Sequence, residues 1–288
     1  MLAILLALVS FISWGTGDIF GTLASRKIGT YLSTLYLLIF LIPVYLFAVF
    51  LFPAGLENLT IGTLLLTITI GIIGAIGLLT FYEGLRRGIA SVVVTISATF
   101  PAIVVILSII FLKEKITLAQ AAVIFLILLG VVISTLDISE IKKRKLKLDA
   151  GVIYAIITAL LWGIYWTFIK IPVEQIGWAW PNLLTMSGLP LVYLVTKIKK
   201  VKIYKNDFWE NKYILILNSA CLGVGSIALN YAIKLGGNVS IITPIAGSYP
   251  VLFVILSFFI FKDKISKPQI IGVITTLCGI VLLSFLSV

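Results

Sequence analysis

The sequence lacks histidine and has little charge: its 288 residues include two cysteines, and charged residues make up 11% of the chain. The absence of histidine excludes a Ser–His protease centre and a His-ligated metal site. Cys221 and Cys278 both lie inside apolar runs, so no disulfide framework is predicted. We expect neither a metal nor a cofactor.

The scarcity of charge also excludes a soluble protein, because too few charged residues are present to cover a surface that faces water. Hydrophobic residues make up 61% of the chain and its mean hydropathy is +1.20, whereas a soluble domain is roughly 45–50% apolar and about a quarter charged. The net charge of +11 does not indicate a nucleic-acid partner, because the basic residues lie in short loops between apolar runs. In such loops Lys and Arg set the orientation of membrane helices. The lipid bilayer is the solvent that suits this chain.

Ten apolar runs approach the length of about 20 residues that a transmembrane helix needs. They cover approximately 2–24, 31–52, 60–82, 89–112, 117–136, 150–171, 179–197, 213–234, 239–261 and 267–287. Backbone facing lipid must satisfy its own hydrogen bonds, and the alternation of a membrane barrel is absent, so these runs are predicted to be helices. The predicted fold class is an all-α membrane protein with ten transmembrane helices. The first run is predicted to be a helix of the protein, not a cleavable signal, because no basic region precedes it.

An internal repeat is the most informative feature of the sequence. Shifted by 149 residues, the stretch 82–132 matches 231–281, and shifted by 148, Trp14-Gly15 matches Trp162-Gly163. The matches include Gly88/Gly237, Ser91/Ser240, Pro101/Pro250, Gln120/Gln269, Gly130/Gly279 and the loops Lys113-Glu114-Lys115/Lys262-Asp263-Lys264. Apolar composition alone would not align these residue types at one offset, so the chain is predicted to be a duplication.

The duplication divides the chain into a first five-helix repeat at 1–136, a basic loop at 137–149 and a second five-helix repeat at 150–288. Because five is odd, the second copy must enter the membrane in the opposite orientation. Inverted repeats have two states related by a pseudo-twofold axis, which is the geometry of alternating access in transporters. The repeat therefore indicates transport.

The distribution of basic residues predicts the orientation in the membrane. Of the 22 Lys and Arg residues, 18 lie in loops 1–2, 3–4, 5–6, 7–8 and 9–10, and four lie in the remaining loops. Because Lys and Arg accumulate in cytoplasmic loops, both termini are predicted to lie outside the cytoplasm.

The doubled motif resembles the drug/metabolite transporter superfamily, specifically proteins with two EamA domains. The residues that carry the resemblance are Trp14-Gly15, Pro101, Glu114, Gln120 and Gly130 in the first repeat, and Trp162-Gly163, Pro250, Asp263, Gln269 and Gly279 in the second. The resemblance implies a ten-helix bundle whose central cavity is lined by helices 1, 3, 4, 6, 8 and 9. It implies substrates such as amino acids, nucleotide sugars, phosphorylated sugars or drugs. Relatives of this type are usually drawn with cytoplasmic termini, the reverse of what the charge count predicts.

Asp18 is the strongest candidate for a functional residue, because it is the only acidic residue well inside a predicted span. A carboxylate at this depth costs about 2.5–3.5 kcal/mol on insertion scales and usually faces a cavity. Trp14 shares its helix face, and the matching face of the second repeat carries Trp162, Trp166 and Lys170. Asp18 and Lys170 together could hold a zwitterion such as an amino acid, although Lys170 could also form an ion pair or extend to the interface.

Further candidates are polar or helix-breaking residues inside the spans. Tyr82 and Tyr231 match each other in the repeat and are either cavity residues or interface anchors. The remaining candidates for the cavity wall are Thr95, Asn230, Thr243, Pro101 and Pro250. The polar ones could instead bond across helices, and each proline frees a backbone carbonyl one turn earlier, which could act as a ligand or a hinge. Glu114 and Asp263 are interpreted first as helix caps or loop charges.

These features favour a secondary transporter in the cell membrane that moves an amino acid or a similar amphiphilic small molecule by alternating access. Burial favours the neutral form of a carboxylate, so Asp18 is the candidate for proton coupling.

A flippase for lipid-linked intermediates and a non-transporting assembly or sensor role stay open, as does homodimerisation. Gly15-Thr16-Gly17-Asp18 matches the GxGD string of intramembrane aspartic proteases, but their chemistry needs a second carboxylate, and every other Asp lies in a loop.

Overall fold

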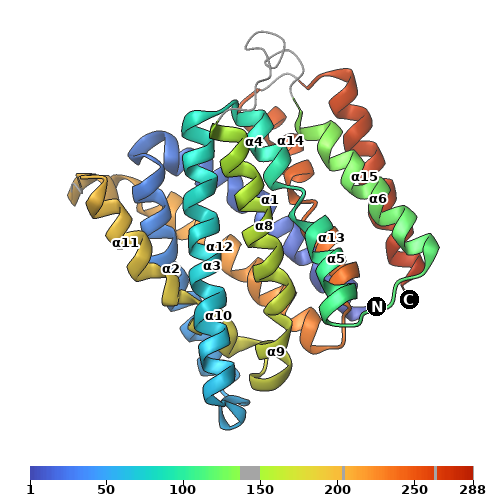
Figure 1. Cartoon of the computed structure of the whole chain (residues 1–288). Coiled ribbons are helices and arrows are strands. Elements are labelled where there is room, and N and C mark those ends of the chain that lie inside the picture. Colours follow the sequence, from blue (N-terminus) through green and yellow to red (C-terminus); the bar gives the residue numbers. More distant parts are fainter. Residues whose placement is uncertain (137–149, 203–204, 263–264, 288) are drawn as a thin grey trace.

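The computed structural model describes residues 1–136, 150–202, 205–262 and 265–287, and every regular element in these ranges is helical. The helices pack side by side in a bundle (Figure 1). The predicted basic loop at 137–149 and Asp263 lie outside the described residues. The fold is an all-α membrane protein with ten transmembrane segments in two inverted five-helix repeats, as predicted.

Each repeat contains five helical segments, some of which are broken. The first repeat consists of α1 (Leu2–Ile28), α2 (Thr30–Leu51), the short turn η1 (Leu56–Asn58), α3 (Ile61–Arg87), α4 (Ala90–Ser97), α5 (Phe100–Phe111) and α6 (Leu118–Thr135). The second consists of α8 (Ala150–Phe168), α9 (Lys170–Ile176), α10 (Ala179–Leu184), η2 (Thr185–Gly188), α11 (Leu189–Ile198), α12 (Lys205–Lys234), α13 (Val239–Ala246), α14 (Tyr249–Ile260) and α15 (Lys267–Leu286).

The seventh segment departs from the uniform helix that hydropathy predicts. Nine segments among the described residues are each long and apolar enough to cross a membrane. The seventh predicted span instead consists of α10, η2 and α11, with a 3₁₀ turn over Thr185–Gly188 at its centre. Pro190 lies in the first turn of α11, where its missing N–H costs no helical hydrogen bond. The break puts irregular backbone at the depth of the membrane, which is tolerated where it is covered by protein or lines a cavity.

Helix packing follows the pseudo-twofold relation between the repeats. The first helix of each repeat packs against the third helix of the other, since α1 contacts α12 and α8 contacts α3. The two fifth helices, α6 and α15, lie side by side at one edge of the bundle (Figure 1). The fourth helix of each repeat contacts the first of the other: α5 packs on α8, and α14 packs on α1.

Two glycines show the same relation at atomic scale. A Cβ added to Gly77 would lie 2.7 Å from the ring of Trp162, and a Cβ added to Gly225 would collide with the ring of Trp14. Gly77 and Gly225 are themselves repeat partners, as are Trp14 and Trp162. Each repeat therefore inserts its first-helix tryptophan against a glycine of the other repeat, and only glycine leaves room for it.

The fourth segment of each repeat is interrupted at the matching place. α4 ends at Ser97 before α5 starts, and α13 ends at Ala246 before α14 starts. Pro101 and Pro250 each occupy the first turn of the second piece, where proline is well tolerated. Pro101 and Pro250 therefore mark a break in the fourth segment, and neither lies inside an unbroken helix.

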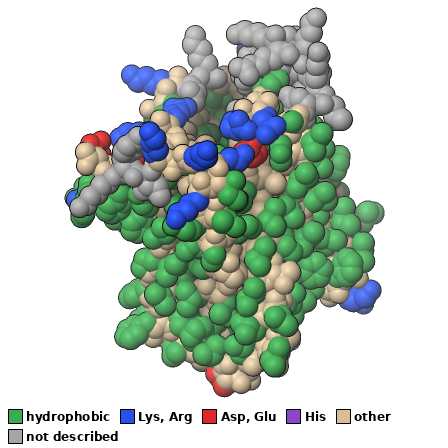
Figure 2. Space-filling view, turned by 60° about the vertical axis from the view of Figure 1, so that its left-hand side comes forward, with side chains coloured by type: hydrophobic (Ala, Val, Ile, Leu, Met, Phe, Trp, Pro, Cys, Tyr) green, Lys and Arg blue, Asp and Glu red, His purple; other side chains and the backbone are tan. Residues whose placement is uncertain are grey.

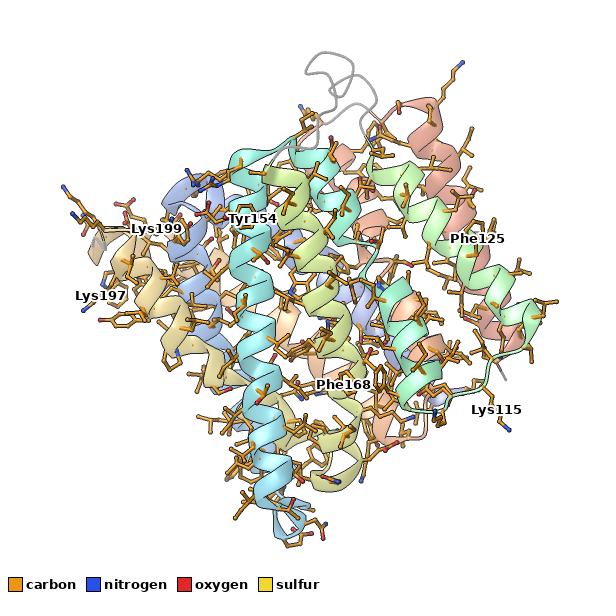
Figure 3. The ribbon with its side chains drawn as sticks, viewed as in Figure 1. Lys115, Phe125, Tyr154, Phe168, Lys197 and Lys199 are labelled. Atoms are coloured by element: carbon orange, nitrogen blue, oxygen red, sulfur yellow. The ribbon has the colours of Figure 1, made fainter. Side chains whose placement is uncertain are left out.

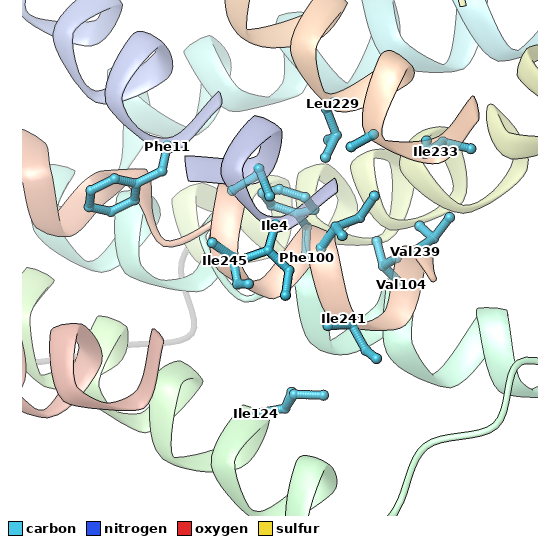
Figure 4. Close-up of a cluster of buried hydrophobic side chains, with 14 of the residues drawn as sticks. Ile4, Phe11, Phe100, Val104, Ile124, Leu229, Ile233, Val239, Ile241 and Ile245 are labelled. Atoms are coloured by element: carbon cyan, nitrogen blue, oxygen red, sulfur yellow. The ribbon is translucent and has the colours of Figure 1, made fainter. Parts of the chain in front are cut away.

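The two ends of the bundle differ in charge. Figure 2 shows Lys and Arg gathered at one end above an apolar belt. Lys197 near the end of α11 and Lys199 directly after it lie at this end, which we call the basic end, whereas Lys115 lies towards the opposite end (Figure 3). Both chain termini lie on the side of Lys115, which we call the terminal end (Figure 1). The main core fills the space between α1, α5, α12 and α13, with Phe100, Leu229 and Ile245 at its centre (Figure 4).

Candidate functional site: a cavity between the repeats

A cavity of about 230 Å³ lies between the two repeats, near the middle of the helices that line it. Its walls come from α1, α2, α3 and the start of α5 in the first repeat, and from α8, η2, α11, α12 and the start of α14 in the second. Transporters built from inverted repeats bind their substrates at this depth and at this interface. The cavity is therefore the candidate substrate site.

The structure brings five of the twelve predicted site residues to this cavity and places the other seven elsewhere. The five are Trp14, Asp18, Tyr82, Trp162 and Trp166. The seven that do not line it are Thr95, Pro101, Lys170, Asn230, Tyr231, Thr243 and Pro250.

Asp18 is the only charged side chain among the residues that line the cavity. It is partly accessible on α1, and within the described part of the chain no hydrogen bond or salt bridge reaches its carboxylate. Tyr82 and Tyr249 line the same cavity. The cavity thus contains a carboxyl group that no positively charged group of the described residues pairs with.

Aromatic rings from both repeats form two connected groups in the cavity wall. In the first, Trp14 lies 4.9 Å from Trp166 and 5.8 Å from Tyr249, measured between ring centroids. Tyr165 extends this group, 4.9 Å from Trp166 at an interplanar angle of 78°. Such edge-on and tilted arrangements are the favourable ones for aromatic pairs.

The second ring group has Trp162 at its centre. Its ring centroid lies 5.4 Å from Phe81 and 6.0 Å from Phe100, and Phe81 lies 5.5 Å from Tyr82. Together the two groups give the cavity largely apolar walls, with Asp18 as the single carboxyl group among the lining residues.

The cavity lining is itself duplicated. Trp14 and Trp162 are repeat partners, as are Leu41 and Leu189, and all four line the cavity. The repeat partner of Asp18 is Trp166. The pseudo-twofold symmetry is therefore broken in the lining by a charge that only the first repeat supplies.

Lys170 is held outside the cavity by an ion pair. Its Nζ lies 2.7 Å from Oε1 of Glu114 and 3.6 Å from Glu174. Glu114 also accepts hydrogen bonds from the backbone N–H of Val239 at 2.9 Å and from the N–H and hydroxyl of Ser240 at 2.8 and 2.6 Å. Glu114 thus caps the start of α13, one of the two interpretations left open by its sequence, and it joins the two repeats at the terminal end.

The pKa of Glu114 reflects this arrangement. Burial alone raises the pKa of a carboxyl, but the hydrogen bonds from Lys170, Ser240 and Val239 outweigh the burial and hold the pKa of Glu114 below its ordinary value. The carboxylate is therefore charged, paired and structural at this position.

Three of the other predicted residues, Thr95, Tyr231 and Asn230, make contacts outside their own helices. The hydroxyl of Thr95 lies 2.8 Å from that of Thr135 on α6, and the ring of Tyr231 packs 5.2 Å from Trp178. Asn230 donates to Asn182 at 3.0 Å. Oδ1 of Asn230 and the buried hydroxyl of Thr243 have no hydrogen-bond partner within the described residues.

Sequence reasoning missed five aromatic residues of the cavity: Tyr45, Phe81, Phe100, Tyr165 and Tyr249. Phe100 and Tyr249 are repeat partners, and each is the first residue of the helix that follows the break. The signal that could have found them is an aromatic residue directly before the paired prolines.

Comparison with known proteins agrees with this architecture. Residues 1–136 and 149–285 each match the EamA-like transporter family. The chain belongs to the EamA-like transporter family. It is 31% identical over 143 residues to an uncharacterized protein of Methanocaldococcus jannaschii, which covers 48% of this chain and 98% of that protein. A solved crystal structure shares its fold with a TM-score of 0.77 at 15% identity, covering 99% of this chain and 96% of the other.

In this EamA-like transporter, the glycines of the Gly15-Thr16-Gly17-Asp18 string serve helix packing. A Cβ added to Gly15 would lie 2.8 Å from the Cβ of Leu252, and one added to Gly17 would lie 3.1 Å from the side chain of Leu222. Both contacts bring α1 close to helices of the second repeat. The match to an intramembrane protease motif is thus explained by the packing of a transporter helix.

Proposed function

We propose that this protein is a secondary transporter that moves a small amphiphilic solute across the cell membrane by alternating access, with proton exchange at Asp18. The observation that carries the proposal is a midspan cavity between inverted repeats that contains one unpaired carboxylate. Aromatic walls suit the apolar part of a solute, and the carboxylate suits a polar or charged part. Because the cavity borders both repeats, a relative movement of the repeats changes which end of the cavity is accessible.

Contacts between the repeats support a state that is closed at the terminal end. There the side chain of Glu114 is only 3% exposed and bonds to Lys170, Val239 and Ser240 of the second repeat. Nε1 of Trp180 also donates to the carbonyl of Pro53 at 2.8 Å. At the basic end, the ion pair between Lys199 and Glu83 is longer, 3.5 Å, and Lys199 is 43% exposed.

Proton exchange at Asp18 follows from its surroundings. A carboxylate without a hydrogen-bond donor in a low-dielectric site favours its neutral form, and contact with water or a bound cation favours the charged form. As the cavity opens to each side in turn, Asp18 takes up a proton on one side and releases it on the other. A solute that competes with the proton for Asp18 is then exchanged for it.

We also propose that both termini lie outside the cytoplasm. The basic end carries Lys197 and Lys199, and the termini lie at the opposite end (Figures 1 and 3). Because basic residues accumulate on the cytoplasmic side, the terminal end faces outward.

Transport into proteoliposomes tests the proposed function. A thermal-shift screen of amino acids, sugars, nucleotides and amines first identifies ligands, because a ligand stabilises the state that it binds. Each ligand is then offered to proteoliposomes with and without a pH gradient. We expect saturable uptake that depends on the protein and is accelerated by the gradient. Binding without uptake of any ligand would contradict a transport function.

A further inference from the structure

The aromatic residues of the cavity wall favour a positively charged ligand. Nine of the lining residues are aromatic, and they belong to both repeats. Aromatic faces carry partial negative charge and attract ammonium groups that lie over them. Asp18 has no cationic partner among the lining residues, and a bound cation favours the charged form of its carboxylate, which adds a negative charge to the cavity. Both features attract cations and repel anions.

Three cations that lie on a lining helix or directly follow one are engaged elsewhere. Lys170 bonds to Glu114 at the terminal end. At the basic end Arg86 and Arg87 both bond to Glu83, at 2.7 and 3.0 Å. An amino acid would bring a carboxylate into a cavity that offers it no basic side chain. A zwitterionic ligand, which the positions of Asp18 and Lys170 in the sequence suggested, therefore lacks its second partner.

Two helix starts at the cavity wall are the alternative partners for a carboxylate. α5 and α14 begin at Phe100 and Tyr249, and a helix N-terminus attracts anions through its free N–H groups. The breaks before them are short, however, and the N–H groups of Thr99 and Ser248 bond to carbonyls of the preceding turn, Ile96 and Ile245. These starts thus offer fewer free donors than an isolated helix.

We propose that the cavity binds a small organic cation, an amine or quaternary ammonium with an apolar body and no carboxylate. The inference rests on the proposed function, because it names the solute class of the same site. The volume of about 230 Å³ limits the ligand to a small molecule, since cavities for drug-sized ligands are about 300–1,000 Å³. The ammonium group lies at Asp18, and the apolar body lies between the two ring groups.

Calorimetric binding to the purified full-length protein in detergent tests the charge of the ligand with one ring system held constant. The probes are tryptamine (a cation), tryptophol (neutral), tryptophan (a zwitterion) and indole-3-propionate (an anion), with tetraethylammonium as a cation without a ring. We expect tryptamine to bind at least tenfold more tightly than tryptophol, tetraethylammonium to bind measurably, and tryptophan and indole-3-propionate to bind more weakly than tryptophol.

Two variants that each neutralise one carboxylate sharpen the test. Asp18→Asn should lower the affinity for tryptamine at least tenfold and leave that for tryptophol unchanged. Glu174→Gln, which neutralises a half-exposed carboxylate at the terminal end, should change neither. If Asp18→Asn does not fold, lowering the pH of the unmodified protein provides the same test, because protons compete with tryptamine but not with tryptophol.

Several outcomes would overturn the inference. Tryptophan or indole-3-propionate could bind as tightly as tryptamine, or neither cation could bind. The affinity for tryptamine could also stay the same both in Asp18→Asn and when the pH is lowered. Failure of the proposed function would look different, since cations would bind as expected and yet not cross the membrane. If instead an anion or zwitterion binds and is transported, the transport function holds and the cation inference fails.

Discussion

The Nζ of Lys170 lies 2.7 Å from Oε1 of Glu114, and this ion pair joins the second repeat to the first. The carboxylate is nearly inaccessible and receives three more hydrogen bonds from the start of α13. The repeat partner of Glu114 is Asp263, but that of Lys170 is Thr22, which has no charge. An ion pair between Glu114 and Lys170 therefore forms at the terminal end. The matching residues at the basic end, Asp263 and Thr22, cannot form an equivalent ion pair because Thr22 has no charge.

A double-mutant cycle measures the coupling of this pair. Removing one partner of a buried pair costs about 3 kcal/mol or more, because the other charge stays buried without it. We expect Lys170→Met and Glu114→Gln each to destabilise the purified protein, and the double variant to be more stable than the sum of their effects implies. The free energy of unfolding in detergent is the measurement, and a coupling of about 1 kcal/mol or more is expected. Glu174→Gln is the control, with an effect below about 0.5 kcal/mol, because its carboxylate is exposed. Additive single effects would contradict the prediction.

The same carboxylate predicts a dependence of stability on pH. The pKa of Glu114 in the folded protein is lower than in the unfolded chain, where it is about 4.3. The unfolded state therefore binds the proton more readily, and the stability that Glu114 contributes is present above about pH 4.3 and is lost as the pH falls through the folded pKa. We expect the melting temperature to fall on acidification in the unmodified protein and less steeply in Glu114→Gln. Glu57→Gln, in an exposed loop, should retain the original slope, and equal slopes in all three proteins would refute the assignment.

Asp18→Asn keeps the size and hydrogen-bonding capacity of the side chain and removes its titration. Because solute and proton compete for Asp18 in the proposed cycle, we expect this variant to lose accumulation driven by a pH gradient in proteoliposomes. Exchange of solute for solute should persist when the solute concentration is raised about tenfold or more, to offset weaker binding. Accumulation equal to that of the unmodified protein would make Asp18 a structural hydrogen-bonding group.

Cysteine labelling tests the orientation. In a background with Cys221 and Cys278 replaced by alanine, Leu2→Cys places a thiol at the terminal end and Lys202→Cys places one on the exposed segment between α11 and α12. We expect a membrane-impermeant maleimide to label Leu2→Cys in intact cells and Lys202→Cys only after lysis. The reverse pattern would show that the termini are cytoplasmic and that the loop charges mislead.

Substitution of the paired glycines tests the reciprocal packing. Gly77→Val and Gly225→Val each place a branched side chain where a tryptophan ring packs. Forcing extra atoms into a packed site costs about 1–3 kcal/mol, and we expect both variants to lose stability to a similar extent. Because Trp162 and Trp14 must move, ligand binding should weaken in both. Gly62→Val is the control, because a Cβ there meets only the hydroxyl of Thr60 at 3.8 Å.

The sequence was sufficient to predict the helical fold and the inverted repeat, because lipid leaves few options for the backbone and a constant offset shows the duplication directly. It did not reveal the break at Thr185–Gly188, since the apolar residues on both sides fill the length of one span, and the prediction took that length as one continuous helix. The helix breaks before Pro101 and Pro250 were also missed: the prolines were recognised, but a proline inside a helix and one in its first turn give the same sequence pattern.

The cavity was predicted in part, for a similar reason. Trp14 and Asp18 share a helix face, and that face does point into the cavity. Lys170 continues the matching face of the second repeat but lies one turn beyond the cavity, beside Glu114. Helical spacing fixes the direction of a side chain but not the depth at which a cavity ends. The ion pair of Lys170 also depends on how the loop of the first repeat that carries Glu114 packs against the second repeat, and helical spacing does not predict this packing.

Asp18 and Trp166 occupy matching positions in the two repeats, and this difference affects how a bound molecule would be oriented during transport. The symmetry operation exchanges the two ends of the cavity, but it cannot exchange a carboxylate for an indole. A charged group held by Asp18 therefore stays beside α1 in both states, while the rest of the molecule stays against α8. In the proposed cycle the solute would therefore cross the membrane without tumbling, and its head and tail would face the same helices when it enters and when it leaves.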